Sequence, residues 1–192
     1  MRITTKEAAT NISRRIIKAK LAKHGGLDVE FEQTIKFLND KEEEIELTSD
    51  ASLSCKNFPH PDLVNAFNMM RAHLAIITDM PEAIGLSLHD LDDKEDLIEK
   101  FKVSSFSIGG SGESEGVTLS GGKKLNGGKI LNLSTPFTKF DDENDPYEYH
   151  YELKSLIDHA CDEVNEYLDG KIAPNAQQEI PFGESDDDHD LE

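Results

Sequence analysis

Hydrophobic and polar residues alternate along residues 14–33, which is the pattern of β-strands with one buried and one solvated face. A His-Gly-Gly stretch at 24–26 interrupts the alternation, and glycine favours the left-handed backbone of a short hairpin loop. The pattern therefore predicts a β-hairpin with a three-residue loop. The expected cross-strand pairs are Leu21 with Val29, Ala19 with Phe31, Lys20 with Glu30 and Lys18 with Glu32.

Further strands are predicted on both sides of a central segment. A third strand is expected near 43–49, with Ile45 and Leu47 pointing inward. Strand-like segments separated by glycine-rich turns follow later in the chain, at 101–108, 117–120 and 129–137.

Apolar spacings of three and four residues predict two main helices. The first covers 61–78, where Pro61 suits the first helical position, and its apolar face consists of Leu63, Ala66, Phe67, Met70, Leu74 and Ile77. The second runs from Pro146 to Asp169, and Gly170 is suited to end it.

These elements predict an α+β fold with a mostly antiparallel sheet, a central amphipathic helix and a long C-terminal helix. Two arrangements fit the element order: a small, partly open barrel of the oligonucleotide/oligosaccharide-binding (OB) type, or an open sheet with both helices on one face. The expected organisation is an N-terminal lead-in at 1–13, one domain at 14–170 and a disordered acidic tail at 171–192.

Net charge limits the partners. The formal charge is −19, and 32 acidic against 19 basic residues in residues 1–170 leave −13 on the expected domain. Because like charge repels a phosphate backbone, nucleic acid could bind only at a local basic patch. A basic protein partner fits the overall charge more easily.

Cysteine usage and hydropathy indicate the compartment. Cys55 and Cys161 are isolated and form no Cys-x-x-Cys pair, which is typical of reduced intracellular proteins. The N-terminal segment lacks an apolar stretch of signal-peptide length, and no segment has the length and apolarity of a membrane span. We therefore expect a cytoplasmic protein without membrane contact.

Basic residues cluster in two places, both within predicted strands or turns, where a nucleic-acid groove of a barrel would run. The candidate nucleic-acid-binding residues are Arg14, Arg15, Lys18, Lys20, Lys123, Lys124 and Lys129. Phe101, Phe106 and Phe137 could supply stacking platforms for bases. The alternative is structural, with Lys18 and Lys20 only balancing the facing glutamates.

The last predicted helix carries the opposite pattern. Its outward positions are acidic: Glu148, Glu152, Asp158, Asp162, Glu166 and Asp169. Carboxylates in a row can imitate the phosphates of a duplex and occupy a DNA-binding protein. A merely solvated face has the same composition.

No motif predicts catalysis, a metal or a cofactor. Residues 112–116 fit the Gly-x-Ser-x-Gly pattern of hydrolases, but that pattern requires a helix after the serine, and a strand is predicted here. His159 and Glu163 lie one helical turn apart, a spacing that a solvated helix face also produces. The sequence thus favours a binding protein over an enzyme.

The tail contains the stretch QQEIPF followed by a run of acid. Gln177, Ile180 and Phe182 resemble the Gln-x-x-Leu-x-Phe motif by which bacterial replication and repair proteins dock on the sliding clamp. The same stretch resembles the acidic Ile-Pro-Phe end of bacterial single-strand-binding proteins, although here ten residues follow the phenylalanine. Both resemblances imply a linear docking motif for a replication protein.

More broadly, the chain resembles small uncharacterised phage and prophage proteins. The resemblance lies in the N-terminal strands, in PHPDLVNAF, in GVTLSGGKKL and LNLSTPF, and in a last helix ending in EYLDGK. It implies an accessory role in DNA metabolism, with single-stranded nucleic acid or a replication protein as partner. The alternatives are an acidic DNA mimic that inhibits a host DNA-binding or defence protein, and a phage scaffolding protein. The sequence does not determine the oligomeric state.

Overall fold

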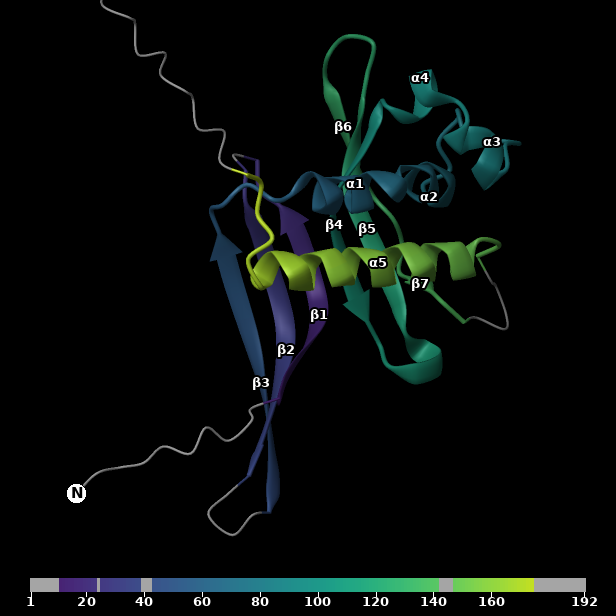
Figure 1. Ribbon diagram of the computed structural model, residues 1–192. Helices are drawn as coiled ribbons and strands as arrows, with labels where there is room; N and C mark the ends of the chain where they lie inside the picture. Colours follow the sequence, from purple (N-terminus) through teal and green to yellow (C-terminus); the bar gives the residue numbers. More distant parts are fainter. Residues whose placement is uncertain (1–10, 24, 39–42, 142–146, 175–192) are drawn as a thin grey trace, which may run out of the picture.

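The computed structural model describes residues 11–23, 25–38, 43–141 and 147–174, and it shows the predicted α+β fold (Figure 1). The strands are β1 (Asn11–Leu21), β2 (Leu27–Leu38), β3 (Glu44–Cys55), β4 (Phe101–Gly109), β5 (Gly116–Lys124), β6 (Ile130–Ser134) and β7 (Thr138–Lys139). The helices are α1 (Pro61–Met69), α2 (Arg71–Ile77), α3 (Leu88–Asp92), α4 (Glu95–Ile98) and α5 (His150–Leu168).

All strands pair antiparallel in one sheet of order β3-β2-β1-β4-β5-β6, with β7 pairing the start of β5. This confirms the open-sheet alternative. The OB-type barrel is not confirmed, because closure would require β3 to pair with β6 and these strands lie at opposite borders of the sheet. Among the described strands, both borders are therefore free edges.

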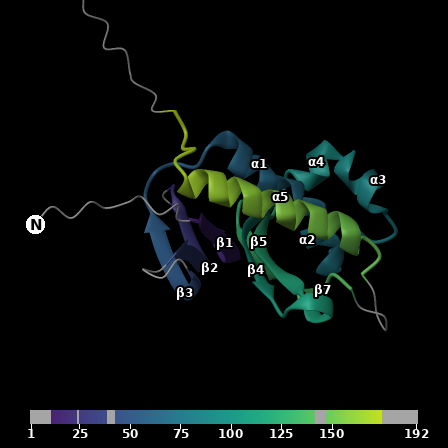
Figure 2. The ribbon, with the colours of Figure 1, turned by 60° about the horizontal axis from the view of Figure 1, so that its bottom comes forward.

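The helix predicted over 61–78 is divided in two and is not central. Met70 ends α1 and precedes α2 with φ −84° and ψ 2°, and its N–H bonds the Phe67 carbonyl three residues back. Both helices lie with α5 on one face of the sheet (Figures 1 and 2). The predicted long C-terminal helix is confirmed as α5.

The β1–β2 hairpin forms, but its register differs from the prediction by two residues. Leu21 lies opposite Leu27 and Ala19 opposite Val29, because the loop closes at Ala22 through hydrogen bonds to Gly26 and Gly25 of 3.1 and 3.2 Å. A shift of two residues keeps every side chain on its predicted face.

The pairs of the lysines change with the register. Lys20 lies opposite Asp28 and Lys18 opposite Glu30. A bulge at Ile17 then shifts the pairing by one further residue, so that Ile16 faces Phe31. The alternation of hydrophobic and polar residues determines on which side of the sheet each side chain lies. It cannot distinguish registers that differ by an even number of residues.

In the third strand, Ile45 and Leu47 lie on the predicted side of the sheet, but neither is buried. β3 extends to Cys55, and Leu47 is 55% exposed while Ile45 is only half-buried. The alternation is real, but α5 covers the sheet only farther along, where Phe31 and Ala51 lie. The outer half of β1–β3 projects beyond the helices (Figure 1).

The main core lies between the sheet and the helices. Phe67 of α1 and Phe106 of β4 are fully buried with ring centroids 5.4 Å apart. The buried stripe of α5 covers the same core with Leu153, Ile157, Ala160, Val164 and Tyr167. A second, smaller cluster joins α2, α3 and α4 to Phe101 at the start of β4.

The described chain continues past Gly170 to Pro174 and remains attached to the domain. Lys171 Nζ lies 2.9 Å from Asp62, 2.9 Å from Glu163 and 2.6 Å from Glu166. Ile172 forms a bridge with Pro59, and the Tyr167 hydroxyl donates to the Asn57 carbonyl at 2.6 Å. Gln177, Ile180 and Phe182 lie outside the described residues.

The hairpin loop yields a stability prediction. Gly26 has φ +86°, and a Cβ there would collide with the backbone carbonyl of Cys55. We expect Gly26→Ala to lower the free energy of unfolding by roughly 1–3 kcal/mol, measured by urea denaturation. Gly127→Ala is the control, since a Cβ at that position meets no atom within 4 Å. Equal stability of the two variants would contradict the register described above.

Candidate anion-binding face

No described helix covers the second face of the sheet. Apolar residues of β1, β4 and β5 that face the helices, such as Ala19, Phe106 and Leu119, are fully buried. Residues that alternate with them, such as Lys20, Ser105 and Ser120, point away from the helices and are exposed or half-exposed. We call this opposite side the open face.

The open face is divided by charge. On β2 and β3 it carries the acids Asp28, Glu30, Glu32, Glu44, Glu46 and Asp50. By contrast, β4, β5 and β6 contain no acidic residue at all, in a chain in which 39 of 192 residues are acidic. Lysine, serine, threonine, asparagine and glycine replace them, at Lys102, Ser105, Ser107, Thr118, Ser120, Gly122, Lys124, Asn132 and Ser134.

Strand pairing brings residues distant in the sequence into rows on this acid-free half. Lys20 of β1 lies opposite Ser105 of β4, which lies opposite Ser120 of β5, and Ser120 lies opposite Ser134 of β6. The hydroxyls of Ser120 and Ser134 are 3.4 Å apart. The rows present hydrogen-bonding groups beside a cation, which is a surface that suits an anionic, polar ligand.

A depression of about 490 Å³ lies at one end of the rows. Four lysines line it, Lys23, Lys100, Lys102 and Lys124, and Glu99 is its one acidic lining residue. We call it the lysine pocket. Lys23, Lys102 and Lys124 make no ion pair within the described part of the chain. Their charges are therefore available to a ligand, within a protein that is otherwise strongly negative.

Two glycines form part of the pocket lining. A Cβ on Gly121 would collide with the Lys102 carbonyl, so β4 and β5 approach closely only because no side chain stands there. A Cβ on Gly122 would lie 2.7 Å from the Ile130 side chain. Glycine at these two positions thus allows β4, β5 and β6 to pack closely beneath the pocket, and Gly122 itself is buried.

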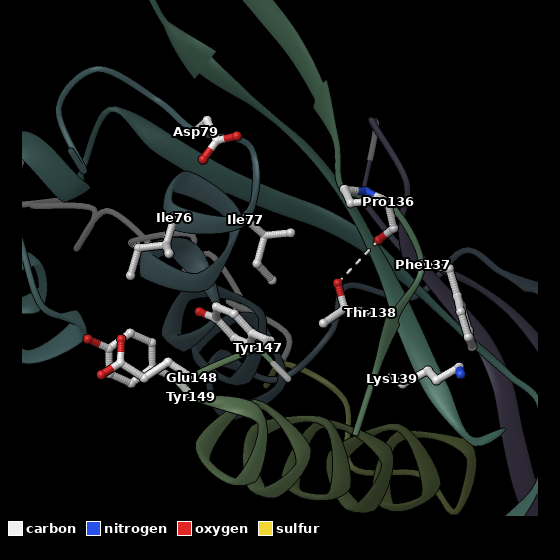
Figure 3. A pocket seen from close by; sticks show the side chains of 10 residues that line it. All are labelled: Ile76, Ile77, Asp79, Pro136, Phe137, Thr138, Lys139, Tyr147, Glu148 and Tyr149. Carbon is white, nitrogen blue, oxygen red and sulfur yellow. Dashed lines mark hydrogen bonds between the residues drawn. The ribbon is translucent and has the colours of Figure 1, made fainter. Parts of the chain in front are cut away.

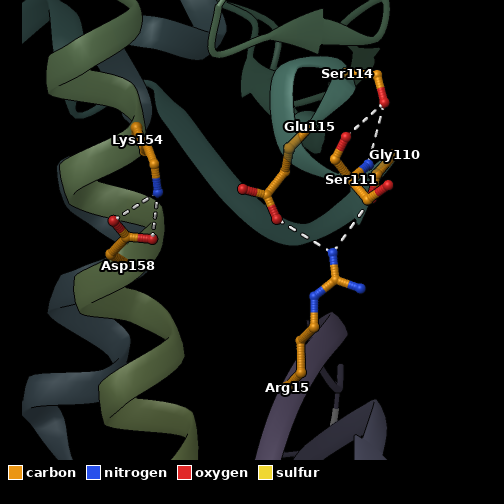
Figure 4. Close-up of polar contacts among 7 residues, drawn as sticks. All are labelled: Arg15, Gly110, Ser111, Ser114, Glu115, Lys154 and Asp158. Carbon is orange, nitrogen blue, oxygen red and sulfur yellow. Dashed lines mark hydrogen bonds and ion pairs between the residues drawn. The ribbon is translucent and has the colours of Figure 1, made fainter.

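The structure separates the predicted basic residues by role. Arg15 donates to Glu115 and to the Gly110 carbonyl, at 3.2 and 3.3 Å, and ties β1 to the β4–β5 turn (Figure 4). Arg14 pairs with Asp169 at 2.7 Å, and Lys18 with Glu30 at 2.8 Å. The charges of these three side chains are therefore already balanced by carboxylates of the same chain.

The remaining predicted bases divide between the two sides of the sheet. Lys123 points toward the helices, where it pairs with Glu82 and lies 5.6 Å from the Phe101 ring centroid. Lys20 and Lys124 lie on the open face, and Lys129 is exposed in the turn after β5. The pairing of β1 with β4 adds Lys100 and Lys102, which the sequence interpretation missed because they form no local cluster.

The predicted stacking platforms are reduced to one. Phe101 and Phe106 are 1% exposed and belong to the core, because the alternation of β4 points them at the helices. Phe137 is 47% exposed. Its ring packs over Gly109 and Gly116, whose missing Cβ atoms would point to the open face. It therefore stands at the far end of the rows, about 20 Å from the lysine pocket at 3.3 Å per residue.

A second depression of about 540 Å³ lies at the border of the helix layer, between α2 and the segment that holds β7 (Figure 3). Ile77, Thr138 and Tyr147 line it. Behind it, the Tyr147 hydroxyl lies 2.9 Å from Nδ1 of the buried His73. Burial lowers the pKa of His73 to about 4, so this imidazole is neutral at pH 7 and supports packing.

The acidic face of α5 is partly neutralised by the protein's own cations. Asp158 pairs with Lys154 at 3.0 Å, Glu166 with Lys171 and Asp169 with Arg14. Glu163, which lies one helical turn from His159 and was considered with it as a possible metal ligand, is buried and forms an ion pair with Lys171. The described residues contain no group of three or more potential metal ligands.

No family model, curated protein or solved structure matches this chain. Among the helices that the structure describes, none has the length and apolarity needed to cross a membrane.

Buried His73 yields a pH prediction. The pKa is 6.5 in the unfolded chain and about 4 in the folded protein, so between these values the unfolded state binds more protons. Stability is therefore complete above pH 6.5 and is lost as the pH falls toward 4, by about 2 kcal/mol at pH 5. We expect His73→Phe to flatten this part of the pH profile of unfolding.

Tyr147→Phe is the control for this measurement. It removes the hydrogen bond but leaves the buried imidazole, so the steep dependence between pH 6.5 and 5 should persist. An unchanged slope in His73→Phe would show that other groups carry the acid sensitivity.

Proposed function

We propose that this protein is a non-enzymatic accessory protein of phage or prophage DNA metabolism that binds single-stranded nucleic acid on its open face. The observation that carries the proposal is the absence of acid from β4, β5 and β6, together with the unpaired lysines of the lysine pocket. In a chain of charge −19, acid-free strands beside lysines that make no ion pair among the described residues form a surface where a phosphate backbone would be repelled least.

Different residues of the open face would contact different parts of a bound single strand. Lys20, Lys102 and Lys124 supply positive charge for phosphates, and the serine rows supply hydrogen bonds to phosphate and sugar. Phe137 supplies an aromatic face on which one base can stack. Such contacts do not read base edges in a groove, so the proposed binding is weakly selective for sequence.

A single strand fits this surface better than a duplex does. The acid-free half of the open face is flanked by the acids of β2 and β3, which would repel the second phosphate backbone of a duplex. Unpaired bases also expose the ring faces that Phe137 can contact, whereas bases in a duplex are stacked on each other.

The tail would connect this domain to a replication protein. The support is the resemblance of Gln177, Ile180 and Phe182 to a clamp-docking motif, placed three residues after Pro174, where the described chain ends. The acidic DNA mimic is the alternative. It is supported by the net charge and by Glu148, Glu152 and Asp162, which have no ion-pair partner among the described residues.

Charge reversal in the lysine pocket tests the proposal. Each phosphate contact on a single strand contributes about 0.7 to the slope of log affinity against log salt. Lys102→Glu with Lys124→Glu should therefore weaken binding to fluorescent oligothymidylate, measured by anisotropy, and reduce the salt slope by about 1.4.

The matched control for the pocket is Lys94→Glu. Lys94 precedes α4, in the helix layer, and Lys94→Glu alone is compared with each single reversal in the pocket, which changes the net charge by the same amount. If the pocket variant and the control variant weaken strand binding equally, the effect is due to the overall charge and not to the pocket. If the unaltered protein binds no strand even at low salt, strand binding is excluded and the DNA-mimic alternative is favoured.

Alanine at Ile180 and Phe182 tests the tail. A linear motif that orders on binding should have micromolar affinity, about −8 kcal/mol, for a bacterial sliding clamp. Removal of both apolar anchors should abolish that binding, because they supply most of its free energy. Neutralising Asp186, Asp187 and Asp188 should mainly slow association.

Thermal melting completes the tail experiment. A free ligand contributes nothing to the stability of the domain, so the melting temperature of the double-alanine variant should be unchanged. A fall of several degrees would show that Ile180 and Phe182 pack on the domain and do not serve as a docking motif.

A further inference from the structure

β3 is a long and regular strand whose outer edge pairs with no other described strand. It pairs with β2 through twelve consecutive residue pairs without a bulge, and it contains no proline. Figure 1 shows β3 at the outer border of the sheet. Native proteins protect such an edge with proline, a bulge, an inward charge or charged side chains on the strand; β3 has no proline, bulge or inward charge, and its three acids all lie on the open face.

The apolar residues of β3 are unusually exposed. Leu47 is 55% and Leu53 45% exposed, and both point to the side of the sheet that holds the core. Beside them on β1, Ile12 is 48% exposed. The chain thus leaves an unpaired strand edge and uncovered leucines in the same place.

We propose that β3 pairs antiparallel with β3 of a second copy of this chain, around a two-fold axis at Ser49. A residue then lies opposite the one that is equally far from Ser49 on the other strand. The apolar side pairs Ile45 with Leu53 and Leu47 with Ala51. The acidic side pairs Glu44 with Ser54, Glu46 with Ser52 and Asp50 with Thr48.

This register is selected by charge together with apolar contact. Every acid of β3 faces a hydroxyl residue, and every large apolar residue faces another apolar residue. A two-fold at Asp50 would place that carboxylate opposite its own copy, and a two-fold at Thr48 would place Glu46 opposite Asp50. A two-fold at Ala51 also keeps the acids apart, but it places Leu53 opposite Ser49 and pairs fewer residues of β3. If the strands slid by a single residue, apolar side chains would lie on the acidic side.

The dimer joins the two sheets into one. Because both strands keep their apolar residues on the same side, the two-fold axis stands perpendicular to the sheet. Both helix layers then lie on one side and both open faces on the other. The interface is a single strand pair, so the association is weak and depends on protein concentration. Acids of the two copies remain diagonal neighbours, and salt therefore strengthens the dimer.

A disulfide at the axis tests the register. In a Cys55→Ala background, Ser49→Cys places two thiols opposite each other, with Cα atoms about 4.5–5.5 Å apart, which a disulfide can span. Mild oxidation should give a covalent dimer in high yield. Asp50→Cys is the control and should cross-link little, because it faces Thr48 and not its own copy. Preferential cross-linking through position 50 would overturn the proposed register.

Sedimentation equilibrium of the full chain tests the dimer itself. The mass should rise with concentration and with salt, and Leu53→Glu should raise the dimer dissociation constant at least tenfold. Ile84→Glu is the matched control, because Ile84 is exposed in a turn away from β3, and it should change nothing. A monomer at every concentration and salt would overturn the proposal.

The chain's own tail is the competing occupant of the β3 edge. Residues 171–173 already run antiparallel beside residues 58–59, so the tail begins near the end of β3. If the tail covered the edge, alanine at Ile180 and Phe182 would uncover it and increase dimerisation. We expect no change in that variant, and dimerisation seen only after these substitutions would assign the edge to the tail.

Discussion

Three residue pairs hold the sheet together across its middle. Lys18, Ala19 and Lys20 of β1 lie opposite residues 105–107 of β4, and no other strand pairing joins the first three strands to the rest. So short a junction is stable because Ala19 and Phe106, its central pair, are both buried under the helices. The helix α5 packs across it, and Arg15 connects β1 to the β4–β5 turn where the strands diverge.

The open face follows from that arrangement. Every described helix packs on one side of the sheet, so the residues of the other side must be polar without being covered. Polarity alone would be satisfied by acids, as it is on β2 and β3. The acid-free composition of β4, β5 and β6 is therefore a property that packing does not require, and it is the reason to assign this half of the face to an anionic ligand.

Local patterns determined what the sequence could predict. Alternation gave the faces of β1 and β2, and helical spacing gave the buried stripe of α5, because both depend on neighbours within one element. Register, sheet order and the exposed leucine at 47 depend on which strands meet and on how far a helix reaches. The lysine pocket has the same origin: Lys23 follows β1 and Lys124 ends β5, and both line one pocket only because β1 pairs with β4, across some 85 residues of chain, and β4 pairs with β5.

The basic residues fall into two groups, those in ion pairs that stabilise the fold and those assigned to the ligand by the proposed function. Those that face the helices or the ends of the sheet, including Arg14, Arg15, Lys123 and Lys171, are all paired with carboxylates of other elements. They offset the repulsion inside a strongly negative chain, and Lys171 alone contacts three acids. Within the part of the chain that the structure describes, Lys102 and Lys124 make no such ion pair. A chain with 39 acids and 20 bases has few cations, and under the proposed function these two lysines would contact phosphate, whereas the paired cations stabilise the fold.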